Sequence, residues 1–288
     1  MEVIKVMKNM LYLVVPSNLK NRREVLRFCK SVDINLNIKI FFVNQSIDLS
    51  LNDIYKFSTC IVKEYKTGGI VPLSIARNIV LDDMYKNEML CMNNALVMFV
   101  DDDAWFPKET INQLLNEDMG AYCLRTIDPE CNKSFNGISY TNGEVKGWHL
   151  IHDICSICLV VPYKELYENR MYFNTKLGLG NTISQGEESL FIYKLHKKSI
   201  KIFYKEYFIY HPYKLSNNIK NYYSLSYFWA WGLTHVSKIF AWPCVKYLAK
   251  YTVALGLTYR SDRYPKIFKA VWKGAIEGIK NTENISIE

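Results

Sequence analysis

The sequence predicts an α/β protein: a Rossmann-like mixed sheet flanked by helices, followed by a helical C-terminal extension. Apolar strand-like runs alternate with helical periodicity from residue 10 to about residue 210, and successive runs end in polar residues. After residue 213 the chain becomes rich in aromatic and basic residues, which we interpret as helices. We therefore expect a sheet whose strand ends converge on one crevice.

The composition is that of a globular protein. Its 288 residues are 49% hydrophobic and 22% charged, which is enough to bury a core. The eight cysteines are scattered, and only Cys155 and Cys158 form a CxxC pair, without a second pair or a histidine cluster for zinc. We expect reduced, mostly buried thiols, as in the cytosol. Charges interrupt the first ten residues, so they do not resemble a signal peptide, and we expect a cytoplasmic protein.

The first part of the chain predicts four strands and two helices. The strands are expected at 10–15, 38–43, 59–64 and 95–100, and the helices at 21–31 and 74–85. A turn is expected at Pro16-Ser17-Asn18, and polar residues 44–46 end the second strand. The 95–100 run is apolar throughout, which is typical of a strand buried on both faces in a parallel sheet.

The pattern becomes mixed after residue 103. Strands are expected at 120–125 and 156–161, with a polar loop at 128–147 between them, and an edge strand is expected at 200–210. Glu187 and Glu188 open a helix, where acidic residues also suit the helix dipole. We divide the chain into a domain at 1–213, with halves at about 1–105 and 106–213, and an extension at 214–288.

Three consecutive aspartates, Asp101 to Asp103, follow the buried 95–100 strand. Adjacent carboxylates repel one another, so a positive partner is expected. Oxygen ligands suit Mg²⁺ or Mn²⁺, usually together with substrate phosphates. The alternative is a solvated loop, with Asp103 merely preceding the helix that starts at Pro107.

The tail concentrates the positive charge of the protein. Residues 212–288 hold eleven Lys and Arg against four Asp and Glu, and four of the six tryptophans. This pattern suggests a surface that meets anionic lipid headgroups, whereas no motif indicates nucleic acid. The alternative is a helical subdomain that packs its aromatic residues inward. Lys238, Lys246 and Lys250 recur at helical gaps, and Pro243 predicts two shorter amphipathic helices.

Five signals in order resemble the GT-A glycosyltransferases, in particular the family 2 enzymes of bacterial surface-polysaccharide synthesis. The resemblance covers about residues 10–213, and its specificity lies in the order and spacing of the signals. They are Val14-Val15-Pro16, Ala76-Arg77-Asn78, Phe99-Val100-Asp101-Asp102-Asp103, Gly178-Leu179-Gly180 through Gly186-Glu187-Glu188, and Tyr210-His211-Pro212.

The resemblance implies a set of roles. Asp101 and Asp103 match the DXD motif, so they would serve a Mn²⁺ or Mg²⁺ ion and the diphosphate, and Asp102 would reach the ribose or orient the metal site. His211 would complete the metal site, and Glu188 would be the catalytic base. The remaining residues that the resemblance implies for the nucleotide sugar are Pro16, Asn18, Asn44, Ser46, Arg77 and Asn78, and those for the acceptor are Gly180, Gly186, Glu187 and Trp148.

The sequence departs from the family pattern at two of these positions. Asn44 stands where the family usually has an aspartate that reads the nucleotide base, and an amide offers hydrogen-bond donors as well as acceptors. Glu188 stands where aspartate is commoner, which lengthens the reach by one methylene. For Arg77 the alternative is a helix-surface residue paired with Asp82 or Asp83.

The resemblance implies an inverting, metal-dependent hexosyl- or N-acetylhexosaminyltransferase. A UDP-sugar is the expected donor. The expected acceptor is a glycan, either free or linked to polyprenyl diphosphate. We expect the protein itself to bind peripherally to the inner face of the membrane. The alternatives are a nucleotidyltransferase, for which no Gly-rich phosphate loop is present, and a non-catalytic nucleotide- or glycan-binding subunit. The sequence leaves open whether the chain forms a homo-oligomer.

Overall fold

A computed structural model of the chain describes residues 8–91, 93–134, 143–212, 218–257, 264–281 and 285. The expected domain boundary at residue 213 and part of the loop at 128–147 lie outside these residues. Within them, no helix is both long enough and apolar enough to cross a bilayer.

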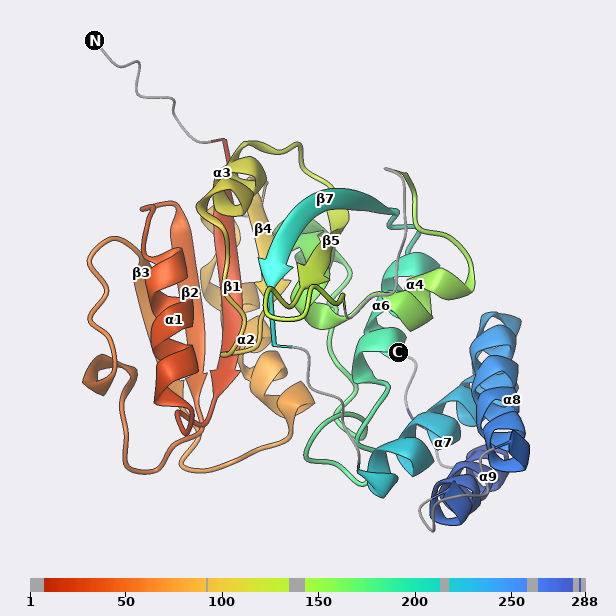
Figure 1. Cartoon of the computed structure of the whole chain (residues 1–288). Helices are drawn as coiled ribbons and strands as arrows, with labels where there is room; N and C mark the ends of the chain where they lie inside the picture. Colours follow the sequence, from red (N-terminus) through yellow and green to blue (C-terminus); the bar gives the residue numbers. More distant parts are fainter. Residues whose placement is uncertain are drawn as a thin grey trace.

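A seven-stranded mixed sheet forms the centre of the fold, in the order β3-β2-β1-β4-β6-β5-β7 (Figure 1). The first four strands run parallel to one another, β6 is antiparallel to β4 and β5, and β7 is parallel to β5. The strands are β1 (Met10–Ser17), β2 (Ile38–Asn44), β3 (Ile61–Lys66), β4 (Ala95–Phe99), β5 (Ala121–Ile127), β6 (Leu159–Pro162) and β7 (Ile202–Tyr210). The predicted α/β class is confirmed.

Helices cover both faces of this sheet, with α1 in front of it and α2 behind it in the view of Figure 1. Every residue of β4 is buried, as the uniformly apolar sequence predicts for a central strand. The helices of this part are α1 (Arg22–Val32), α2 (Leu73–Asn87), α3 (Lys108–Asn116), α4 (Trp148–Asp153), α5 (Tyr163–Glu168) and α6 (Glu187–Lys197). Short 3₁₀ helices lie at η1 (Leu51–Asp53), η2 (Met89–Cys91), η3 (Ser156–Cys158) and η4 (Lys238–Phe240).

The strand order reverses at β1, because β2 pairs with one side of β1 and β4 with the other. Ligands bind in the crevice beyond the carboxyl ends of strands at such a point. The structure corrects two boundaries there. Pro16 and Ser17 belong to β1 rather than to a turn, and the strand expected at 156–161 begins only at Leu159, because residues 156–158 form η3.

The described cysteines are free thiols, as the scattered spacing predicts. Cys158 Sγ lies 3.5 Å from Cys155 Sγ and 3.6 Å from Cys123 Sγ. A hydrogen bond to Cys158 together with burial raises the pKa of the Cys155 thiol well above its ordinary value. Since the thiolate is the nucleophile, this group is a structural thiol.

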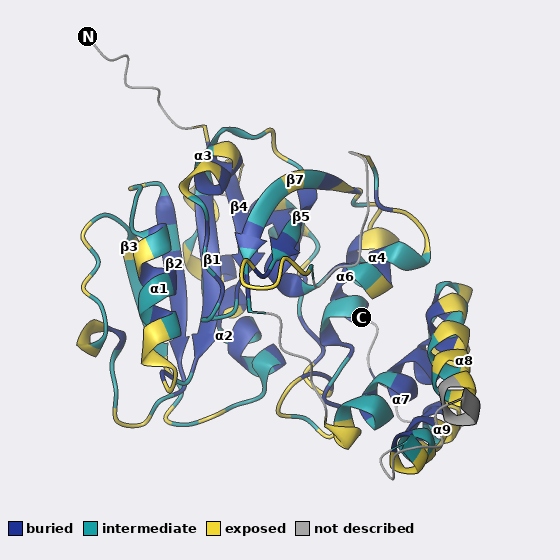
Figure 2. Ribbon diagram, viewed as in Figure 1, coloured by how far each residue is buried: buried dark blue, intermediate teal, exposed yellow. Residues whose placement is uncertain are grey.

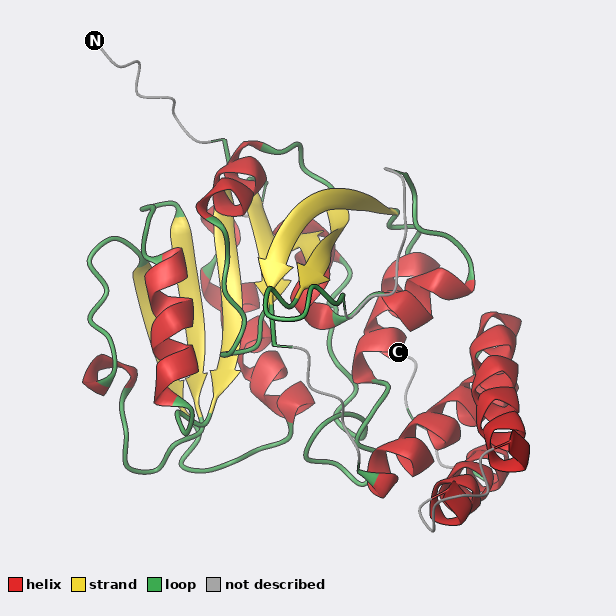
Figure 3. Cartoon of the chain, in the orientation of Figure 1, coloured by secondary structure: helices red, strands yellow, loops and turns green. Residues whose placement is uncertain are grey.

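The extension consists of helices α7 (Ile219–His235), α8 (Ala241–Leu257) and α9 (Tyr264–Lys280) (Figure 3). Helix α9 packs closely on α7, because a Cβ at Gly274 would lie 2.3 Å from the Tyr223 carbonyl and one at Gly278 2.3 Å from the Tyr227 carbonyl. The predicted split into shorter helices is confirmed, but Pro243 is not the break. It occupies the first turn of α8, where a missing N–H costs no hydrogen bond, and the chain breaks earlier, at η4.

The aromatic residues of α7 lie inside the protein. Tyr227, Phe228, Trp229 and Trp231 are all buried, and Phe228 and Trp229 pack on Phe240. Of the two interpretations of the tail, inward packing of aromatic residues is therefore the one that holds for α7. Its apolar area is used to join the extension to the α/β part, for which burial of aromatic side chains supplies a large driving force.

Candidate metal and nucleotide-sugar site

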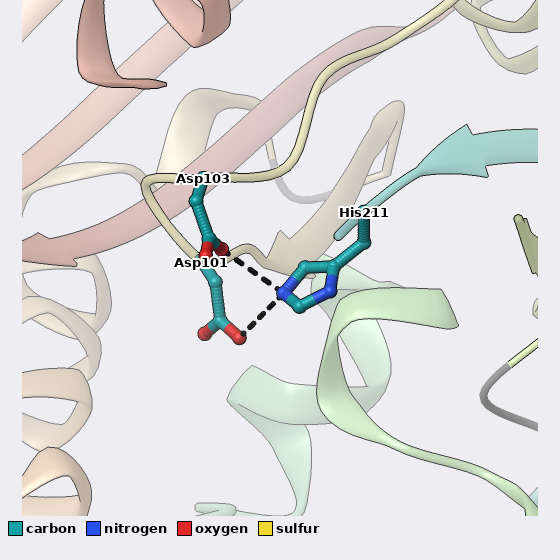
Figure 4. A group of neighbouring side chains, drawn as sticks. All are labelled: Asp101, Asp103 and His211. Carbon is teal, nitrogen blue, oxygen red and sulfur yellow. Dashed lines mark ion pairs between the residues drawn. The ribbon is translucent and has the colours of Figure 1, made fainter. Parts of the chain in front are cut away.

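Two of the three aspartates meet the histidine that ends the last strand (Figure 4). His211 Nε2 lies 3.0 Å from Asp103 Oδ1 and 3.6 Å from Asp101 Oδ2. The ligand atoms of these three residues all lie within 4.8 Å of one another. Residues 101–103 follow β4 and residue 211 follows β7, so the sheet brings together side chains that are far apart in the sequence.

This group is built to hold positive charge. Burial lowers the pKa of His211, but its hydrogen bonds to Asp101 and Asp103 outweigh that effect and raise the pKa to about 10. His211 Nδ1 lies 2.9 Å from the carbonyl oxygen of Pro212. With this raised pKa the metal-free ring carries both N–H groups: Nδ1–H donates to that carbonyl, and Nε2–H donates to the carboxylates from the position where a metal ion would replace the proton. Two carboxylate oxygens and one imidazole nitrogen could together hold a divalent cation such as Mn²⁺.

A cavity of about 470 Å³ opens beside the three aspartates. The predicted residues Pro16, Asn18, Gly180 and His211 line it, and the Asp102 side chain accepts a hydrogen bond from the Ser17 hydroxyl at the end of β1. Sequence analysis missed Ser17, Lys20, Asn21 and Gln45, which line the same cavity. The polar residues at the end of β1 were a sequence signal for Ser17, whereas nothing in the sequence singled out Lys20.

Asn44 and Ser46 do not line this cavity. Asn44 is fully buried, and its amide donates to the Leu49 carbonyl and to Glu64 while its oxygen accepts from the Ser46 backbone N–H, each at 2.7–2.8 Å. The Ser46 hydroxyl accepts from the Leu49 N–H at 3.1 Å. These side chains shape the loop after β2, and the neighbouring Gln45 faces the cavity instead.

Arg77 is buried beneath the site rather than on the surface of its helix. Only 1% of it is exposed, and its Nη2 lies 2.7 Å from Ser156 Oγ, 3.5 Å from Glu188 Oε1 and 3.9 Å from Asp101 Oδ1. The expected alternative, a pair with Asp82 or Asp83, is wrong. Asp82 accepts from the Tyr172 hydroxyl, and Asp83 accepts from Lys63 and Tyr65.

The two glutamates at the start of α6 lie in different environments. The side chain of Glu188 is 29% exposed. It accepts a hydrogen bond from the Ser156 hydroxyl and forms an ion pair with Arg77. Glu187 is buried against Gly178, and burial, reinforced by the charge of Glu188, raises its pKa to about 7. Ser156 was missed by sequence analysis because nothing in the sequence sets this serine apart.

The remaining predicted residues have other neighbours. The Asn78 side-chain amide donates a hydrogen bond to the Phe173 carbonyl and accepts one from the Phe173 N–H, each at 2.9 Å. Gly186 has a φ of 99°, and a Cβ there would lie 2.3 Å from the Phe228 ring, so it fixes α6 against α7. Trp148 stacks on His149 and lies under Lys246 of α8. The structure therefore brings Asn78, Gly186 and Trp148 into protein contacts outside the lining of the cavity.

Comparison with known proteins agrees with this fold. A mannosyltransferase from Pyrobaculum calidifontis, PcManGT, solved in complex with GDP-Man and Mn²⁺, matches with a TM-score of 0.58 over 96% of this chain and 89% of its own, at 11% sequence identity. No protein-family model matches the chain, and no curated protein sequence matches it. The chain therefore shares the fold of this mannosyltransferase.

Proposed function

We propose that this chain is an inverting, metal-dependent glycosyltransferase that moves a hexosyl or N-acetylhexosaminyl group from a nucleotide sugar to a hydroxyl of a glycan acceptor. The observation that carries the proposal is that Arg77 connects the possible metal-binding group to the carboxylate of Glu188. Asp101, Asp103 and His211 converge beside a cavity, and Arg77 links Asp101 to the carboxylate of Glu188. The glycosyltransferase fold supports the same interpretation.

Different residues around the cavity would bind the metal ion, the phosphates and the ribose of the nucleotide sugar. Asp101, Asp103 and His211 would hold Mn²⁺ or Mg²⁺, which neutralises the charge that develops on the departing nucleoside diphosphate. Lys20 supplies a positive charge in the cavity lining for the phosphates. Asp102, which accepts a hydrogen bond from the Ser17 hydroxyl, would bind a ribose hydroxyl. In this proposal residues 1–105 bind the nucleotide sugar and residues 106–213 the acceptor.

Glu188 acts as the base in this reaction. The acceptor oxygen attacks the anomeric carbon, the bond from that carbon to the diphosphate oxygen breaks, and the hydroxyl proton passes to Glu188. Its partly exposed carboxylate is accessible to a hydroxyl, whereas Glu187 is buried and better suited to support the loop at Gly178. Single displacement from the opposite side of the ring inverts the configuration of the sugar.

The identity of the nucleotide base and of the acceptor is proposed from the sequence resemblance and from the residues that line the cavity. A UDP-sugar is the proposal from the resemblance of the sequence, whereas the structural neighbour was solved with GDP-Man. Gln45 offers both donor and acceptor atoms to a base edge, so both nucleotides belong in a screen. For the acceptor we propose a bacterial surface polysaccharide or its lipid-linked precursor, met on the inner face of the membrane.

A screen of nucleotide sugars tests the proposal. We expect one UDP- or GDP-sugar to raise the melting temperature of the purified protein only when Mn²⁺ or Mg²⁺ is present, because a ligand of the native state stabilises it. The same sugar should release nucleoside diphosphate slowly without acceptor, with water replacing the acceptor hydroxyl. No stabilisation by any nucleotide sugar contradicts the proposal. Stabilisation without any turnover, with or without glycan acceptors, identifies a binding subunit instead.

We expect Arg77→Met to lower kcat about a hundredfold while changing the KM for the nucleotide sugar little. Arg77 is too deeply buried to touch a ligand and instead positions Glu188 relative to Asp101, and misplacement of a reacting group costs about this much. The steady-state rate of nucleoside diphosphate release measures both constants.

A double-mutant cycle separates this positioning role from general destabilisation. In the Glu188→Gln background the Arg77→Met change should have little further effect, because the group that Arg77 positions is already inactive. Arg125→Met is the control, since Arg125 of β5 also lies over a phenylalanine ring, that of Phe208, but is not the arginine that pairs with Asp101 and Glu188. Additive losses, or an equal loss at Arg125, would show that Arg77 only supports the fold.

A further inference from the structure

The outer side of the extension carries apolar side chains that the fold leaves exposed. Figure 2 shows exposed residues along the outer sides of α8 and α9. Their exposed fractions range from 38% for Trp272 to 58% for Val253. We name the six of them the α8–α9 outer face: Trp242, Val245, Val253, Trp272, Ile276 and Ile279.

These residues form one surface rather than six separate sites. Trp242, Val245 and Val253 are spaced by three and eight positions, so they share one side of α8, which begins beside α4, where the Trp242 ring lies 6.4 Å from that of Trp148. Trp272, Ile276 and Ile279 are spaced by four and three positions on α9. The indole N–H of Trp272 donates to the Thr252 hydroxyl at 3.3 Å, next to Val253, which joins the two stripes.

Lysines border this apolar surface. Lys246 and Lys250 follow Trp242 and Val245 on α8, and Lys269, Lys273 and Lys280 lie beside Trp272 and Ile279 on α9, all of them exposed. Between them α8 and α9 contain a single acidic residue, Glu277, which pairs with Lys273 at 3.8 Å. An apolar centre with tryptophans and a basic border is the chemistry that anionic lipid headgroups and their upper acyl chains recognise.

We propose that the α8–α9 outer face docks reversibly on an anionic membrane. A second copy of this chain is a poorer occupant, because a symmetric dimer would place the two lysine borders against each other with one glutamate per chain to offset them. The proposal places the lipid contact of the tail on α8 and α9, because Phe228, Trp229 and Trp231 of α7 are internal. It adds to the proposed function by placing the enzyme beside a lipid-linked acceptor, but binding itself needs no catalysis.

Vesicle flotation of the full chain tests the proposal. We expect the protein to float with vesicles of phosphatidylcholine and phosphatidylglycerol at low salt, and not with phosphatidylcholine alone. Changing Lys250, Lys269 and Lys273 together to glutamate should weaken partitioning by at least about a hundredfold, since each basic residue near an anionic surface contributes about fivefold. High salt should mimic this variant by screening.

Two further variants make the test specific. Trp242→Ser with Trp272→Ser should weaken binding at both low and high salt, because it removes apolar insertion rather than charge. Changing Lys30, Lys108 and Lys197, which are exposed on α1, α3 and α6, to glutamate applies the same charge change elsewhere and should leave binding near that of the parent protein.

Several results would overturn the docking proposal. The first is failure of the parent protein to bind anionic vesicles at low salt. The second is an equal loss of vesicle binding in the Lys30, Lys108 and Lys197 control. The third is a concentration-dependent dimer that the tryptophan variant abolishes, in a protein that binds no vesicles. The last result would assign the surface to a second copy of the chain. The readout is vesicle binding and not turnover, so its failure is distinguishable from failure of the nucleotide-sugar screen.

Discussion

We expect Asp103→Asn to abolish the proposed glycosyl transfer, with a loss of at least about a thousandfold, or about 4 kcal/mol of transition-state stabilisation. Asp103 lies 3.0 Å from His211 Nε2 and provides one of the two carboxylates of the proposed metal group. Asparagine keeps the shape of the side chain but removes the charge that attracts the cation. Turnover at saturating nucleotide sugar and Mn²⁺ is the measurement.

Two readouts connect this loss to the metal group. Titration with Mn²⁺ should show much weaker binding in the variant. In the metal-free variant the pKa of His211 should fall from about 10, because one of the two carboxylates that raise it is gone, and NMR of the imidazole measures that change.

Asp102→Asn is the matched control for this charge change. Asp102 bonds to Ser17 and is not part of the metal group, so its effect on Mn²⁺ affinity should be small. A near-normal rate for Asp103→Asn with added metal would make the aspartates an ordinary loop. An equal loss of Mn²⁺ affinity in both variants would mean that the metal is held differently.

The second large effect is expected at Glu188. Glu188→Gln should lower the rate of transfer by about two to four powers of ten, the usual share of general-base catalysis, while leaving the affinity for the nucleotide sugar nearly unchanged. The amide retains hydrogen bonding to Ser156 but cannot accept the proton of the acceptor hydroxyl. Single-turnover kinetics measure the chemical step, and calorimetry measures binding.

Glu187→Gln is the comparison for this variant. Glu187 is buried with a pKa of about 7, above its ordinary value, so folding disfavours its charged form and its contribution to stability decreases as pH rises from about 4.5 to about 7. The variant should therefore lose little activity and should be more stable than the parent protein above pH 7, as measured by urea denaturation. A greater loss of turnover at Glu187 than at Glu188 would reverse the two assignments.

Local patterns of residues were enough to predict several elements of the fold. The apolar run at 95–99 predicted a central strand, which the structure confirms, and the order of the residues placed three carboxylates directly after that strand. The start of α6 at Glu187 and the edge position of β7 also followed from local composition and alternation. These features are set by the preferences of neighbouring residues, which a sequence displays directly.

Only the tertiary structure decided which side chains meet. Arg77 contacts Ser156 and Glu188, which lie 79 and 111 positions away in the sequence. An arginine on the surface of the same helix would have the same neighbours in the sequence, so those neighbours do not reveal the contacts. The structure likewise turned Gln45 rather than Asn44 toward the cavity, and it buried Phe228, Trp229 and Trp231 of α7 while leaving Trp242 of α8 and Trp272 of α9 exposed. Periodicity tells which face of an element is apolar, but what covers that face depends on segments distant in sequence, and those contacts exist only once the chain has folded.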